Sequence, residues 1–125
     1  MDWLGMFVPR FRPRQPAESL APASEDDLER LAELREQGSR LNLPHPVRGY
    51  VAFAAEPAAR TAADILRKEG FACTIRSAHD GSWTITAIRQ LVPTPGAITR
   101  FREQLQELTA DHGGAYRGWD APIVS

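Results

Sequence analysis

The chain has 125 residues, a length that one domain fills, and a core of this size needs neither a disulfide nor a metal for stability. Its 15 basic and 16 acidic residues give a formal net charge of −1, which excludes a general electrostatic attraction to nucleic acid or anionic lipid. The single cysteine, Cys73, excludes an intramolecular disulfide. The apolar run from Trp3 to Val8 is far too short to span a membrane, so we predict a cytoplasmic protein.

The first 23 residues differ in composition from the rest, and we expect residues 1–23 to form a flexible leader rich in proline and arginine. The predicted domain then occupies residues 24–125. Proline fixes φ and lacks a donor N–H, which excludes a long helix or a central strand in the leader. The leader's prolines are Pro9, Pro13, Pro16 and Pro22.

An alternative for the leader is contact between residues 1–14 and a membrane surface or a partner. Its basis is the helical spacing of Trp3, Phe7 and Phe11, which lie beside three arginines. Pro9 interrupts this apolar face, so we favour the flexible leader.

The first predicted helix begins at Ser24, a capping serine that is followed three residues later by the acid Asp27. Acidic residues in the first turn also suit the positive end of the helix dipole. The helix ends before Gly38, and its apolar stripe consists of Leu28, Leu31, Ala32 and Leu34. A loop that contains His45 between Pro44 and Pro46 is expected next.

A strand is predicted from Val47 to Ala54, with Val47, Val51 and Phe53 on one face. Pro57, in a first helical turn, opens the next helix, and Gly70 ends it. Small residues on the inner face of this helix would let it lie close to a sheet. The face consists of Ala59, Ala62, Ala63 and Leu66.

A hairpin follows, because two alternating segments flank an Asp80-Gly81 turn signal. Thr94 and Pro95 start the last helix as its cap and its first-turn proline, and Gly113 with Gly114 ends it. The final strand is expected within residues 115–124. The inward residues are Phe71, Cys73, Ile75, Trp83, Ile85 and Ala87 in the hairpin and Ile98, Phe101, Leu105 and Leu108 in the helix.

The order after the first helix is strand, helix, strand, strand, helix, strand. This order predicts an α+β fold: a ferredoxin-like βαββαβ sandwich with a four-stranded antiparallel sheet and an extra N-terminal helix. The sheet face away from the two crossover helices is left for the extra helix, for solvent or for a partner. Alternation predicts that it carries Tyr50, Thr74, Arg76, Thr84, Thr86 and Ile88.

No catalytic, cofactor-binding or metal-binding motif is visible, so we predict a protein that is not an enzyme and has no cofactor. The three histidines are far apart, and Cys73 is predicted to be a small apolar residue on the inner sheet face. Direct RNA binding would need exposed aromatic residues on the central strands, and Tyr50 is the one good candidate. We therefore do not expect direct binding of nucleic acid.

A set of short motifs in fixed order resembles the RraB family (regulator of ribonuclease E activity B), over residues 26–124. The ending is its most specific part, although Ala115 and Arg117 stand where the family usually has acids. The motifs are Leu34-Arg35-Glu36-x-Gly38, Ala62-Ala63-x-x-Leu66, Gly81-x-Trp83, Val92-Pro93-Thr94-Pro95 and Gly114-x-Tyr116-x-Gly118-Trp119-Asp120.

The resemblance implies a ferredoxin-like, non-catalytic regulator that binds ribonuclease E and alters RNA decay. Trp119 is expected to be a packing anchor. The alternative is an interface in which Trp119 and Tyr116 are central, with Arg117 and Asp120 at the rim. Alternative functions are a small-molecule sensor and a dimeric binding module that pairs through the open sheet face or an edge strand.

Overall fold

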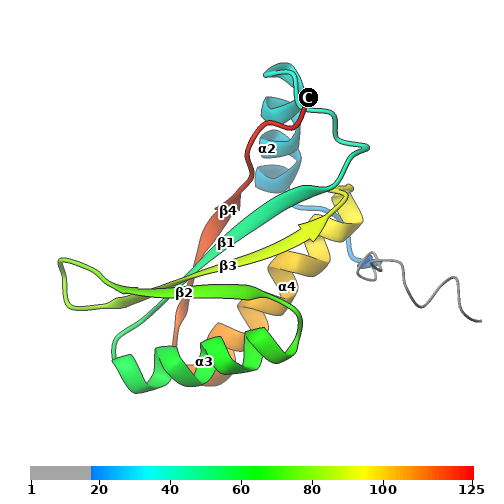
Figure 1. The fold of residues 1–125 in the computed structure, drawn as a ribbon. Coiled ribbons are helices and arrows are strands. Elements are labelled where there is room, and N and C mark those ends of the chain that lie inside the picture. Colours follow the sequence, from blue (N-terminus) through cyan, green and yellow to red (C-terminus); the bar gives the residue numbers. More distant parts are fainter. Residues whose placement is uncertain (1–17) are drawn as a thin grey trace, which may run out of the picture.

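The computed structural model describes residues 18–125 as one four-stranded antiparallel sheet with three helices (Figure 1). The predicted contact of residues 1–14 with a membrane or partner, and the leader up to residue 17, lie outside the described residues. Across residues 18–125, no helix is both long enough and apolar enough to cross a membrane.

The element order is the predicted one, and the strand order in the sheet is β2-β3-β1-β4, which confirms the ferredoxin-like α+β fold. Both β1 and β3 are central, and each pairs antiparallel with its neighbours. The elements are α2 (Glu25–Glu36), β1 (His45–Phe53), α3 (Glu56–Lys68), β2 (Ala72–Ser77), β3 (Trp83–Leu91), α4 (Pro95–His112) and β4 (Ala115–Asp120).

The helix starts follow from the predicted caps. The hydroxyl of Ser24 accepts a hydrogen bond from the Asp27 N–H at 3.2 Å, and Thr94 accepts one from the Ala97 N–H at 3.1 Å. At the other end of α4, Gly113 takes the left-handed conformation, with φ of 73°.

One sequence-based boundary was wrong. β1 begins at His45, so this histidine belongs to a strand instead of the proline-bracketed loop. The final strand lies within the predicted residues 115–124, since β4 runs from Ala115 to Asp120. The loop after α2 binds the segment that follows β4.

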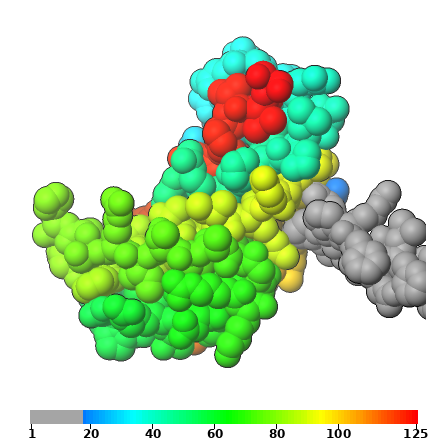
Figure 2. Space-filling model, viewed as in Figure 1, coloured from blue at the N-terminus to red at the C-terminus, as the bar shows by residue number. Residues whose placement is uncertain are grey.

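Ser39 and His45 join these two segments. The Ser39 hydroxyl lies 2.6 Å from Nε2 of the fully buried His45 and accepts a hydrogen bond from the Val124 N–H at 3.0 Å. His45 Nδ1 lies 2.7 Å from the Leu43 carbonyl oxygen, which can only accept, so Nδ1 carries the proton. The C-terminal segment, red in Figure 2, therefore lies against the loop that follows α2.

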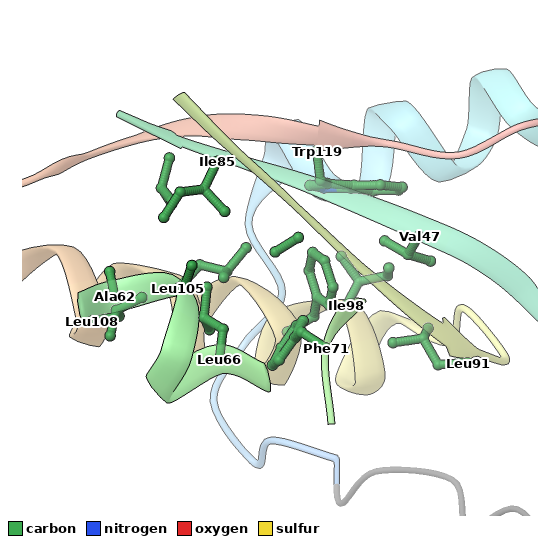
Figure 3. Close-up of a cluster of buried hydrophobic side chains, with 14 of the residues drawn as sticks. Val47, Ala62, Leu66, Phe71, Ile85, Leu91, Ile98, Leu105, Leu108 and Trp119 are labelled. Atoms are coloured by element: carbon green, nitrogen blue, oxygen red, sulfur yellow. The ribbon is translucent and has the colours of Figure 1, made fainter. Parts of the chain in front are cut away.

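The core lies between one face of the sheet and the helices (Figure 3). The alanine-rich face of α3 is fully buried, which confirms that small side chains bring this helix close to the sheet. The predicted inward residues of α4 are buried as well. Cys73 and Ile75, on the edge strand β2, are partly buried and pack against this core.

The opposite sheet face carries the six residues predicted for it. The strand registers place Tyr50 beside Thr86 and Thr74, Thr84 beside Arg76, and Ile88 beside Arg48. α2 packs against α4, so it does not cover this face. We call this surface the open face.

Gly49→Ala should destabilise the fold by about 1–3 kcal/mol, because it inserts a methyl group into a packed core. A Cβ at Gly49 would collide with Leu105 and Phe101 of α4. Urea unfolding measures the change, and Thr74→Val on the open face is the control, expected to lie within about 0.5 kcal/mol of the parent. Equal stability of the Gly49→Ala protein and the parent would contradict the close packing of β1 on α4.

Candidate functional site

The four candidate interaction residues lie on β4, and the strand distributes them over both sheet faces. Gly49 pairs with Trp119 and Val51 with Tyr116, so β4 holds one residue more than β1 between these pairs. Gly118, with φ of 106°, accommodates this bulge. As a result Tyr116 and Trp119 both face the helices, although they are three residues apart.

Trp119 is a packing residue with a specific polar contact. Only 4% of its surface is exposed, and its indole N–H donates a 2.9 Å hydrogen bond to Oδ1 of Asp27 in α2. The other oxygen, Oδ2, accepts a 2.8 Å hydrogen bond from Nε of Arg102 in α4. We call these three residues the Asp27 network. It connects α2, α4 and β4 through one carboxylate.

The Asp27 network is largely buried. The side chain of Asp27 is 5% exposed and that of Arg102 is 19% exposed, so solvent screens this ion pair weakly. The guanidinium of Arg30 lies 5.9 Å from the centre of the Trp119 ring and adds a cation–π contact from α2. These contacts fix the position of α2 against the sandwich.

Tyr116 lies behind the same network with its hydroxyl buried and without a hydrogen-bond partner among the described residues. Burial raises the pKa of this hydroxyl well above its usual value, and the nearby charge of Asp27 raises it further. Tyr116 therefore stays protonated at any physiological pH.

A groove of about 560 Å³ is lined by residues of α2, α4 and β4. We call it the polar groove, because charged side chains dominate its walls. Asp26, Glu29 and Glu33 are exposed along its α2 wall, while Tyr116 and Trp119 belong to its opposite wall. The lining residues are Ser24, Asp26, Asp27, Glu29, Arg30, Glu33, Arg102, Gln106, Tyr116, Gly118 and Trp119.

Asp120 faces the open side of the sheet. Its carboxylate accepts a 2.6 Å hydrogen bond from Nε of Arg48 and one bifurcated hydrogen bond from the Tyr50 hydroxyl, which lies 3.0 Å from each carboxylate oxygen. Partial burial raises the pKa of Tyr50, and the hydrogen bond to Asp120 raises it further. Arg117 is exposed on β4, and alternation directs it away from Tyr116.

The structure thus brings Tyr116 together with Trp119 but places Arg117 and Asp120 on the other face. Asp27 and Arg102 were missed as site residues, because Asp27 was interpreted only as part of a charged helix start. A signal was present, since Asp27, Leu31 and Leu34 follow the spacing of one helix face, and the structure buries all three. An acid that shares a helix face with buried leucines indicates that its carboxylate binds a polar partner inside the protein.

The site shows no arrangement that suits metal chemistry, since residues 18–125 contain no group of three His, Cys, Asp or Glu side chains able to hold an ion. Cys73 is partly buried, and burial raises the pKa of its thiol. A raised pKa leaves little thiolate at neutral pH.

Comparison with known proteins gives one family. The model of the family described as RraB, regulator of ribonuclease activity B, matches residues 24–121, from the cap of α2 to just beyond β4. No curated protein matches the chain.

Asp27→Ala should cost about 3–5 kcal/mol of stability, because it leaves Arg102 and the Trp119 N–H without their buried acceptor. Asp26→Ala is the matched control: its side chain is exposed one residue away, and we expect a change within about 0.5 kcal/mol. Urea unfolding followed by circular dichroism measures both. Similar values for the two variants would show that the network does not hold α2.

Tyr116→Phe should leave the stability at pH 7 unchanged or slightly higher, because it removes a buried hydroxyl without a partner. The folded protein raises the pKa of Tyr116, so the fold loses stability as pH rises above the unfolded pKa of about 10, where the unfolded tyrosine ionises and the buried one does not. Between about pH 8 and pH 11, a range that brackets this pKa, the free energy of unfolding should therefore fall less for Tyr116→Phe than for the parent. An unchanged alkaline loss would contradict burial of the hydroxyl.

Proposed function

The chain belongs to the RraB family of regulators of ribonuclease activity, and from this membership we propose that it binds a ribonuclease of the E type and modulates RNA turnover. The match over residues 24–121 carries this proposal. The regulator acts by binding in the cytoplasm and catalyses no reaction. Homodimerisation through the open face or an edge strand stays a prediction.

We place the ribonuclease contact at the polar groove. α2 carries six acidic residues against two basic residues, and Asp26, Glu29 and Glu33 point along the groove wall. Acidic side chains on one rigid helix suit a basic partner segment, because opposite charges speed association and orient the partner. The near-zero net charge of the whole chain does not prevent this, since the charge that matters is local.

The candidate residues on β4 take different roles in this proposal. Trp119 and Tyr116 both line the groove, and Trp119 also holds α2 through its hydrogen bond to Asp27, so its contribution is to position the acidic helix. Arg117 and Asp120 lie on the open face and contact a partner only if it reaches round the edge strand β4.

The test compares a charge-reversed groove with a matched control. In Glu29→Lys/Glu33→Lys, two exposed acids of the groove change sign. Binding to a purified ribonuclease E-type enzyme should weaken by roughly tenfold or more, since each charge contributes to steering and complementarity. Asp111→Lys reverses one exposed acid in the last turn of α4, away from the groove, and should change binding by less than about twofold.

Surface plasmon resonance at two salt concentrations measures the binding, and an RNA-cleavage assay measures the regulation. The parent should bind more weakly at high salt and should change the rate of RNA cleavage. An absence of binding by the parent would overturn the proposed function. Binding that tolerates the double reversal would move the contact away from the polar groove.

A further inference from the structure

A second groove lies on the other side of α2 and has a different character. It has a volume of about 540 Å³ and is walled mainly by apolar side chains, so we call it the apolar groove. Leu28 lies at its edge with 46% of its surface exposed. The lining residues are Leu28, Leu31, Ala32, Arg35, Leu41, Asn42, Val92, Pro93, Thr94 and Pro95.

The described chain begins beside this groove. The Ser19 N–H donates a 3.1 Å hydrogen bond to the carbonyl oxygen of Gly96, and the side chain of Glu18 lies directly over Gly96. Gly96 follows Pro95, which lines the groove. The first described residues, Glu18 and Ser19, therefore lie near the rim of the apolar groove, where the blue segment meets α4 in Figure 1.

We propose that residues 1–17 of this chain bind the apolar groove, with Trp3, Phe7 and Phe11 as the apolar contacts. The inference is independent of the ribonuclease proposal, since it concerns a different surface and a partner within the same chain. The residue types fit, because three aromatic side chains suit an apolar wall.

Chain length permits the contact. Phe11 lies seven residues before Glu18, and seven residues of a proline-rich linker can span up to about 22 Å. This reach is comparable to the length of α2, roughly 18 Å for its twelve residues. A short tether gives an effective concentration on the order of millimolar, so modest contacts suffice for occupancy.

The test uses the full chain with a spin label. Gly5→Cys carries the label in a Cys73→Ser background, and paramagnetic broadening of backbone amide signals reports which residues it approaches. The proposal expects stronger broadening at Leu28, Ala32 and Leu41 than at Ala110 and Asp111, which are exposed at the far end of α4. A sample that mixes labelled protein with unlabelled, isotope-enriched protein separates contacts within one chain from contacts between chains.

Two variants decide the outcome. Leu28→Glu should lower the bound population about fivefold, as expected for loss of a half-buried leucine contact. Trp3→Ser/Phe7→Ser should give the same loss while α2 keeps its native sequence, which separates docking from damage to the helix. Broadening that neither variant reduces, or that arises only between molecules in the mixed sample, would overturn the proposal, the latter in favour of a second copy.

Discussion

One buried carboxylate holds the extra helix to the sandwich. Asp27 accepts hydrogen bonds from Trp119 on β4 and from Arg102 on α4, residues that lie 92 and 75 positions away in the chain. A buried charge is costly unless it is paired and hydrogen-bonded, so this arrangement is stable only when α2, α4 and β4 are all in place. The position of α2, and with it both grooves, depends on this contact.

The fold was largely predictable from the sequence because its signals are local. Ser24 and Thr94 are capping residues, Pro57 and Pro95 suit first helical turns, and Asp80-Gly81 suits a hairpin turn. The boundary that failed depends on pairing between strands. His45 joins β1 because its backbone pairs with Leu91 of β3, and Ser39 and Leu43 lie within hydrogen-bond distance of its ring nitrogens. Local alternation cannot indicate this pairing.

The site was less predictable, for two physical reasons. An ion pair between residues of α2 and α4 has no signature in local spacing, so Arg102 could not be singled out. The faces of β4 were also uncertain, because alternation assumes a period of two. The bulge at Gly118 breaks that period. The glycine of the Tyr-x-Gly-Trp segment thus lets two aromatic residues three positions apart lie on the same face of the sheet.

α2 forms a wall of both grooves, acidic on one side and apolar on the other. Any displacement of this helix therefore changes the width of both grooves at once. Thermodynamic reciprocity sets the consequence: if a ligand in one groove alters affinity in the other by some factor, the second ligand alters affinity for the first by the same factor. A single helix that one carboxylate anchors would therefore couple the two surfaces if a ligand in either groove displaced it.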